Sequence, residues 1–402
     1  MGSLGNLLVA QAGGATAVIN ESLVGAVDAA RDDGRFTGII GARHGVEGIL
    51  AGDFVDLGRQ PPDLLRAVAR TPSAALGTTR RRLDDEAAVL AIQNLARHDV
   101  HCLAYIGGND SADTASRLAR AASDAGYSLA VVGIPKTIDN DLPDTDHCPG
   151  YGSIARFMAL ATRDAGRDTE ATAGLYPVKL IEVMGRNAGW VAAATALGQE
   201  SVDDAPQLIF FPERPPRDLA GFLDEIDTAR RRHGHVVAVV PETARDAAGS
   251  PLTGAETSWT DSFGHHYYPS PGPLLARAVE EALGVRARYD KPGTIARMFG
   301  VCASETDRRE AREVGAAGVR LLLAGASDVM VTLCRAEGSP YRCDTGSTPL
   351  ASVANRERRL PDEFIDPCGR GVTAAFRAYA EPLIGGPLPP YGRLLDLSVP
   401  NA

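Results

Sequence analysis

The sequence predicts an α/β protein of two lobes, each built on a parallel sheet that helices cover on both faces. Short apolar runs that stop at glycine or proline alternate along the chain with segments of helical periodicity. The chain has 402 residues, of which 44% are hydrophobic and 23% charged, so it can form two cores of ordinary composition. Such alternation of strand and helix is typical of doubly wound, Rossmann-like sheets.

The first half of the chain supplies three strands and three helices to this prediction. A buried strand over 6–12 ends at Gly13-Gly14, and helical spacing follows over 16–30. The other elements of this half are a helix over 88–97, a strand over 102–106, a helix over 111–125 and a strand over 129–134. Glycine or proline follows each strand, as expected where a strand ends in a turn.

The second half continues the alternation. We expect strands over 178–184, 207–211, 235–240 and 328–333, and helices over 189–198, 219–233 and 307–324. Residues 142–152 have loop composition and are expected to cross between the two lobes. The proline-rich tail over 382–397 is expected to pack as an arm.

Charge and cysteine content narrow the function classes. The net charge of −10 and the pI of about 5.4 argue against nucleic acid and anionic membranes as partners, because both need a positive surface. No apolar run reaches the roughly 18 residues of a membrane span, and the first residues lack the basic start of a secretory signal. Six scattered cysteines indicate reduced thiols. We therefore expect a cytoplasmic protein with a small-molecule substrate.

In a doubly wound sheet the ligand lies at the carboxyl ends of the strands. Five predicted strands are followed there by loops of unusual composition; they end near Ala12, Ile106, Ile134, Met184 and Val240. A P-loop is absent, because no lysine follows a glycine in the chain. The pattern G-x-G-x-x-A over 150–155 follows a polar loop, so it fails the strand context of a dinucleotide fingerprint.

Two of these loops could bind phosphate groups. Gly13-Gly14 can present backbone N–H groups ahead of a helix, although a purely structural turn also explains this junction. Asn109 and Asp110 place an amide and a carboxylate at the start of the next helix, where they could hold Mg²⁺ with attached phosphates. The alternative is that Asp110 or Ser111 caps that helix.

The loop over 135–141 (PKTIDND) carries the most informative chemistry. One of its two carboxylates, Asp139 or Asp141, can accept a proton from an attacking hydroxyl while the other holds a metal or a basic partner. Lys136 adds a point charge suited to a phosphoryl group, and it is one of only three lysines among 41 basic residues. A charged Asn-Asp turn is the alternative interpretation.

Three further residues are candidates for the same site. Arg186 follows a strand and precedes a helix, where its guanidinium can clamp a phosphate. Glu242 follows the strand over 235–240 and could accept hydrogen bonds from sugar hydroxyls. Arg80, after Gly77-Thr78-Thr79, adds a cation near the first lobe.

Together these segments resemble the phosphofructokinase family, and specifically its pyrophosphate-dependent branch. The resemblance extends over nearly the whole chain, through QAGGATAVIN, GGNDSADT, PKTIDNDL with TDHCPGYGS, EVMGRNAGW, VVPET, YDKPGTIAR and ASETDRREA. It implies a Mg²⁺-dependent, reversible, glycolytic phosphorylation of fructose 6-phosphate at its 1-hydroxyl, and a homodimer or homotetramer.

The resemblance also implies roles for individual residues. Asp139 would be the base, Asp141 would orient the site, Thr137 would lie against the phosphoryl group, and Arg186 would stabilise it during transfer. Gly14 would bind the donor's phosphates through its backbone, with Arg80 beside it. The sugar-phosphate site would comprise Thr137, Asp139, Asp141, Met184, Gly185, Arg186, Glu242, Arg288, Thr294 and Arg297, with one of the two last arginines crossing a subunit interface.

The predicted donor is pyrophosphate. ATP-using members resemble GGDGS and PGTIDND, whereas this chain has Asp110 and Lys136 at the variable positions. A carboxylate at 110 would fill and repel where a nucleotide's α-phosphate would lie, and the lysine would neutralise the leaving phosphate. Asp110 and Asn109 are the expected metal ligands.

The acceptor is less well defined, because the family's glutamine is lost from the loop over 293–297 and Pro177 lies where an arginine is expected. Sedoheptulose 7-phosphate as acceptor, an ATP-using enzyme and a sugar-phosphate-sensing regulatory subunit stay open. We expect a donor lobe from 1–145 plus about 293–350, and a sugar-phosphate lobe from 146–292 plus about 351–402.

Overall fold

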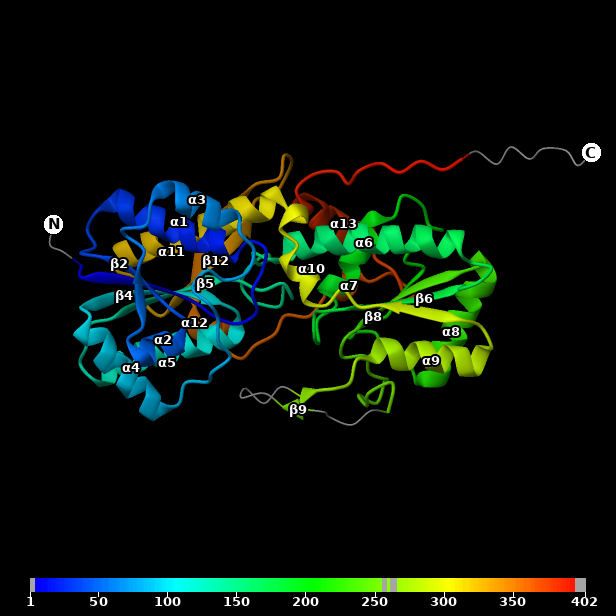
Figure 1. The fold of residues 1–402 in the computed structure, drawn as a ribbon, viewed down its shortest axis with the longest axis horizontal. Helices are drawn as coiled ribbons and strands as arrows, with labels where there is room; N and C mark the ends of the chain where they lie inside the picture. The colour runs from blue at the N-terminus through cyan, green and yellow to red at the C-terminus, as the bar shows by residue number, and fades with distance from the viewer. Residues whose placement is uncertain (1–3, 255–258, 261–265, 395–402) are drawn as a thin grey trace, which may run out of the picture.

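The computed structural model describes residues 4–254, 259–260 and 266–394. Two sheets lie side by side along the long axis of the molecule, each covered by helices on both faces (Figure 1). Each helix in the described part of the chain is too short or too polar to span a bilayer. The predicted α/β fold class is confirmed.

The first sheet has seven strands in the order β13-β12-β5-β4-β1-β2-β3. Their bounds are β1 Asn6–Gln11, β2 Ile39–Ala42, β3 Phe54–Asp56, β4 Val100–Gly107, β5 Ala130–Pro135, β12 Val329–Arg335 and β13 Cys343–Pro349. The five inner strands are parallel, as predicted, whereas the edge strands β3 and β13 are antiparallel to their neighbours. The connection from β12 to β13 is too short for a crossover helix, so this pair must be antiparallel.

Helices cover this sheet in two layers (Figure 1). One layer holds α1 (Ile19–Asp33), α3 (Pro62–Arg70) and α11 (Glu305–Leu323), and the other holds α2 (Val46–Ala51), α4 (Asp85–Arg97), α5 (Asn109–Asp124) and α12 (Leu350–Val353). Helices α1 and α11 approach closely, because a Cβ at Gly25 would lie 2.1 Å from the carbonyl oxygen of Arg312. Glycine is therefore required at this crossing.

The second sheet has four parallel strands in the order β11-β6-β8-β7. Their bounds are β6 Val178–Val183, β7 Leu208–Ile209, β8 Val236–Pro241 and β11 Ala287–Asp290. Helices α6 (Tyr151–Ala171), α7 (Trp190–Ala194) and α13 (Ala374–Ala380) pack on one face, and α8 (Leu219–His233) and α9 (Pro271–Leu283) on the other. The expected strand over 207–211 shortens to two residues, and the expected helix over 189–198 divides into α7 and a 3₁₀ turn, Thr195–Gly198.

Two small elements complete the described fold. Strands β9 (Trp259–Thr260) and β10 (His266–Tyr267) form a separate antiparallel pair. Helix α10 (Thr294–Met298) lies between the two sheets (Figure 1). The chain thus passes from the second sheet back to the first through α10 and α11.

Local sequence explains several helix ends. Asp218 begins α8 by accepting a hydrogen bond from the N–H of Gly221, and Gly234 ends it in the left-handed conformation. Ser304 caps α11 in the same way, with the N–H of Asp307 as donor. Helix α1 instead begins at Ile19, three residues later than predicted, without a side-chain cap.

The described chain passes between the two sheets three times: from β5 to α6, back through α10 and α11, and again from α12 to α13 (Figure 1). Residues 142–150 lead from β5 into α6, as expected of this loop. The strands of the first sheet come from 6–135 and 329–349, and those of the second from 178–290. The domain limits themselves stay a prediction.

The tail contacts α6 as far as Arg393. The hydroxyl of Tyr391 donates to Asp164, and its ring lies 3.7 Å from the guanidinium of Arg163. Arg393 forms ion pairs with Glu170 and Asp204. These contacts fit the predicted arm, whose last residues, 395–397, lie outside the described chain.

Candidate active site

A cavity of about 450 Å³ lies where the carboxyl ends of the two sheets face one another. In the first sheet β2 and β4 flank β1 on opposite sides, so the strand order reverses there. This reversal is where ligands bind in doubly wound folds. Most of the residues predicted from the sequence line the cavity: Gly14, Arg80, Asn109, Asp110, Lys136, Thr137, Asp139, Asp141, Met184, Arg186, Glu242 and Arg297.

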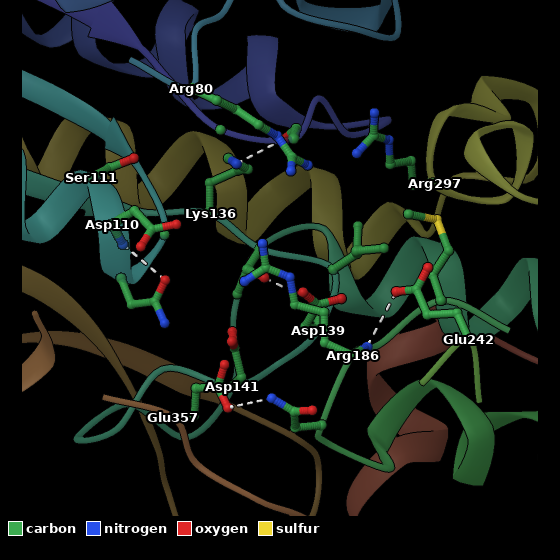
Figure 2. A pocket seen from close by; sticks show the side chains of 18 of the residues that line it. Arg80, Asp110, Ser111, Lys136, Asp139, Asp141, Arg186, Glu242, Arg297 and Glu357 are labelled. Atoms are coloured by element: carbon green, nitrogen blue, oxygen red, sulfur yellow. Dashed lines mark hydrogen bonds between the residues drawn. The ribbon is translucent and has the colours of Figure 1, made fainter. Parts of the chain in front are cut away.

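Lys136 lies at one end of the cavity, against the loop that follows β1 (Figure 2). Its side chain is 3% exposed, and its Nζ atom donates a 2.7 Å hydrogen bond to the carbonyl oxygen of Gly14. Burial, reinforced by the nearby Arg297, lowers the pKa of Lys136 to about 8, although Asp139 and Asp141 oppose this shift. The ammonium group is therefore held in place but is readily deprotonated.

Asn109 and Asp110 form the first turn of α5. Gly108 is the residue before the helix, and no side chain caps it, so the alternative interpretation of Asp110 or Ser111 as a cap is wrong. The amide oxygen of Asn109 accepts the N–H of Asp110 at 2.8 Å, and its Nδ2 donates to the carbonyl oxygen of Arg356 at 3.3 Å. Asp110 is consequently placed in the cavity lining.

The loop after β5 brings Asp139 and Asp141 to the cavity floor (Figure 2). Asn140 between them adopts the left-handed conformation, with φ of 55°. No turn forms at residues 139–141, so the alternative of an Asn-Asp turn is not supported, and both carboxylates line the cavity. Burial raises the pKa of Asp139, while Arg186 and Lys136 oppose the shift. Burial also raises the pKa of Asp141, to which the carboxylates of Asp139 and Glu357 contribute.

Arg186 lies beside Asp139 and comes from the loop after β6 (Figure 2). Its backbone is in the left-handed conformation, with φ of 50°. Glu242 Oε1 accepts the backbone N–H groups of Gly185 and Arg186, both at 3.3 Å, and the hydroxyl of Thr243 donates to the carbonyl oxygen of Arg186. Burial, then Asp139, raises the pKa of Glu242. Residues after β8 therefore fix the conformation of the Arg186 loop.

Arg297 reaches the cavity from α10 and lies against the loop after β1. A Cβ at Gly14 would stand 2.6 Å from Nη1 of Arg297, so a side chain there would displace the guanidinium. Glycine at position 14 thus allows the guanidinium of Arg297 to lie close to the backbone.

Three predicted residues do not line this cavity. Gly185 contributes its N–H to Glu242 instead. Arg288 is exposed on β11, where its guanidinium lies 3.6 Å from the Tyr176 ring and 3.8 Å from Asp168. Thr294 is exposed at the start of α10.

Other residues line the cavity that the sequence analysis did not assign to it. Lys291 Nζ forms a 2.7 Å ion pair with Glu182, a buried residue of β6, whose other oxygen accepts the N–H of Gly272 at 3.0 Å. Glu357 lies next to Asp141 and accepts a 3.3 Å hydrogen bond from Asn187. The scarcity of lysine could have drawn attention to Lys291, whereas no local pattern distinguishes Glu357.

Comparison with known proteins identifies the family. The family model described as Phosphofructokinase matches residues 6–322. The chain belongs to the phosphofructokinase family. It is 40% identical over 391 residues to the pyrophosphate–fructose 6-phosphate 1-phosphotransferase of Xanthomonas campestris pv. campestris, covering 96% of this chain and 93% of that one. The Rhodospirillum rubrum protein of the same name is 40% identical over 398 residues, with coverage of 98% and 97%.

A solved structure supports the same assignment. The crystal structure of the pyrophosphate-dependent phosphofructokinase from Marinobacter aquaeolei is similar with a TM-score of 0.85 and 35% identity, covering 96% of this chain and 94% of that chain. In the present chain, the match to the family model includes the cavity residues up to Arg297 and ends before Glu357. The segment around Glu357 therefore belongs to the part that the family model does not match.

Proposed function

We propose that this chain transfers a phosphoryl group from pyrophosphate to the 1-hydroxyl of fructose 6-phosphate, giving fructose 1,6-bisphosphate and phosphate in a reversible reaction. The single observation that carries the choice of donor is the pairing of Asp110 with a buried Lys136 at the same end of the cavity. The relatives at 40% identity bear the name of this activity.

The donor end suits pyrophosphate for electrostatic reasons. Lys136, with Arg80 nearby, provides positive charge where a compact dianion or trianion would lie. The carboxylate of Asp110 lines the same space and would repel the additional phosphate of a nucleotide. The N–H of Gly13 donates to the carbonyl oxygen of Thr79 at 3.2 Å, so the backbone of Gly14, which has no side chain in the way, is the proposed phosphate contact.

Asp139 is the proposed general base. Its raised pKa makes it a stronger proton acceptor than an exposed aspartate, and its position next to Arg186 places it at the centre of the cavity. Asp139 takes the proton of the 1-hydroxyl as the new O–P bond forms and the bond to the leaving phosphate breaks. Arg186 and Thr137 stabilise the transferred group, and Lys136 neutralises the phosphate that leaves.

The residues at the start of α5 fit Mg²⁺. The carboxylate of Asp110 and the amide oxygen of Asn109 are hard oxygen donors of the kind that this ion prefers. When bound, Mg²⁺ would neutralise phosphate charge. Among the described residues, the cluster of His147, Glu310 and Cys343 could also be read as a metal site. Both nitrogens of His147 are already paired with carboxylates, at 2.8 and 2.7 Å, so an ion-pair network explains that cluster better.

The acceptor end is proposed to hold the sugar phosphate through Arg297, with Met184 and Glu242 alongside. Gly185 shapes this end through its bond to Glu242. Arg288 and Thr294 are exposed in the single chain, so we propose that they contribute within a homo-oligomer, as a dimer or tetramer in the cytoplasm.

The alternatives are less well supported. A sensing subunit has no need of the base and the cations, all of which line one cavity here. The test is turnover by the purified protein, with pyrophosphate or ATP as donor and fructose 6-phosphate or sedoheptulose 7-phosphate as acceptor, at saturating Mg²⁺. We expect the highest kcat/KM with pyrophosphate and fructose 6-phosphate; a preference for ATP or for the seven-carbon acceptor would refute this assignment.

A further inference from the structure

The loop that carries Asp139 and Asp141 is held by a residue more than 200 positions further along the chain. Arg358 Nη2 donates to the carbonyl oxygen of Asn140 at 2.9 Å. Its Nη1 donates to the carbonyl oxygens of Thr145 at 2.7 Å and Asp146 at 2.8 Å. One guanidinium thus binds three carbonyl groups within residues 140–146.

The backbone of Arg358 adds a fourth contact to this loop. Its N–H donates to the carbonyl oxygen of Asp141 at 2.6 Å. The two carbonyls of residues 140 and 141 therefore both point to Arg358. Because Asn140 has a positive φ, which costs energy for a side-chain-bearing residue, the loop needs such external bonds to keep its conformation.

Arg358 is itself fixed by the second lobe. Its guanidinium lies 4.7 Å from the centre of the Trp190 ring, and the indole N–H of Trp190 donates to the carbonyl oxygen of Arg358 at 3.2 Å. Trp190 is 1% exposed and begins α7, directly after the loop that carries Arg186. The same residue therefore contacts the structure behind both Asp139 and Arg186.

The neighbours of Arg358 reinforce this link. The carbonyl oxygen of Arg356 accepts from Asn109, and Glu357 accepts from Asn187. Three consecutive residues, 356–358, thus touch the start of α5, the loop after β6 and the loop after β5. Arg358 does not line the cavity, so it cannot act on the substrate directly.

We propose that Arg358 is a positioning residue for phosphoryl transfer, because it fixes the position of Asp139 relative to Arg186. The proposal rests on the proposed function. Without the guanidinium, three carbonyl oxygens would lose a charged donor and the loop would relax. Misplacement of a catalytic group by about 1 Å can cost about 10²-fold in rate, whereas the sugar phosphate is proposed to be held mainly through Arg297, which none of these contacts involves.

The experiment compares Arg358→Met and Arg358→Lys with a matched control, Arg359→Met, which removes the adjacent exposed arginine. For each full-length variant, kcat and both KM values are measured with pyrophosphate and fructose 6-phosphate. We expect Arg358→Met to lower kcat by about 10- to 100-fold with each KM within about threefold. Arg358→Lys should recover part of this loss, because an ammonium can still donate to the carbonyls, and Arg359→Met should resemble the wild type.

Hydrogen exchange supplies a readout that does not depend on activity. Amides over 139–150 should exchange faster in Arg358→Met than in Arg359→Met, while the strands of both sheets keep their protection. The proposal is overturned if kcat stays within threefold, if exchange in this loop is unchanged, or if exchange rises throughout the molecule and both KM values rise with it. A wild type that does not turn over these substrates refutes the proposed function instead, and the exchange comparison still decides whether Arg358 holds the loop.

Discussion

Nζ of Lys136 donates a hydrogen bond to the carbonyl oxygen of Gly14, which joins the loop after β5 to the loop after β1 at a distance of 2.7 Å. Each residue is set by the end of a different parallel strand. The contact fixes an ammonium group beside the backbone of Gly14, in a cavity to which Arg80 adds positive charge. The donor end is therefore assembled by sheet topology.

The first prediction concerns the titration of Lys136. Its pKa is lowered to about 8 by burial, then by Arg297, and only the protonated form attracts pyrophosphate. Hence kcat/KM for pyrophosphate should fall as the pH rises through about 8, well below the usual lysine range. Lys136→Arg should show no such loss up to pH 10, although its activity should be lower because a guanidinium fork replaces a compact charge. If kcat/KM of Lys136→Arg still falls as the pH rises through about 8, the titrating group is another residue.

The second prediction concerns donor choice. Asp110→Gly should remove repulsion and let ATP bind, while Lys136→Gly should weaken turnover of pyrophosphate. Both residues face the same phosphate groups, so their effects should not add. The double variant should gain measurable ATP-dependent activity without a complete change of donor. Initial rates with each donor test this prediction. If neither Asp110→Gly nor the double variant gains ATP-dependent activity, Asp110 does not exclude ATP.

The third prediction concerns the base. Asp139→Asn should lower kcat by about 10²- to 10⁴-fold while binding of fructose 6-phosphate changes much less. Burial raises the pKa of Asp139, so the acid limb of the wild-type kcat/KM profile should lie above the ordinary aspartate range. The rate should fall as the pH drops through this limb, because the carboxyl group then holds the proton that it must accept. Near-normal kcat in the variant would show that the base is another residue.

The fourth prediction concerns the acceptor end. Arg297→Ala should raise KM for fructose 6-phosphate, with a loss of about 2–4 kcal/mol for truncating one partner of a charged contact. Arg288→Ala is the informative comparison, because Arg288 lies outside this chain's cavity. It should raise KM only if a partner chain completes the site. An unchanged KM in Arg297→Ala would contradict the proposed acceptor site.

The fifth prediction concerns stability. Both ring nitrogens of His147 contact carboxylates, of Asp146 at 2.8 Å and of Glu310 at 2.7 Å. Burial by itself would lower the pKa of His147, but these two hydrogen bonds outweigh it and raise the pKa. The imidazolium therefore contributes stability that is fully present below about pH 6.5, the unfolded value, and is lost as the pH rises through the folded value.

Thermal unfolding between pH 5 and 9 measures this contribution. The wild-type Tm should fall over the interval above pH 6.5, and His147→Gln should show a lower Tm at pH 6 with a flatter dependence. Equal slopes in the two proteins would mean that His147 is not charged in the folded state.

Much of the fold could be predicted because its signals are local. Strands ending at Gly13, Gly107 and Pro135 were placed within one or two residues, since apolar runs and chain breakers lie next to one another in sequence. The predicted helix over 219–233 matches α8, whose cap Asp218 and end Gly234 flank it directly. The length of β7 is overestimated from the sequence, because an apolar run does not reveal how many of its residues pair with a neighbouring strand.

The loops that carry the chemistry could be predicted from local sequence, because parallel strands bring their carboxyl ends to one edge of a sheet. Lys136 and Asp139 follow a strand of the first sheet and Arg186 follows a strand of the second, so they meet where the two edges face one another. The residues that surround these three could not be predicted in this way. Glu357 and Arg358 approach the site from the C-terminal segment, Lys291 pairs with Glu182, and Arg288 turns away to Tyr176. These contacts join residues more than 100 positions apart, and they depend on how helices and loops pack between the sheets, for which the local periodicity of a chain carries no signal.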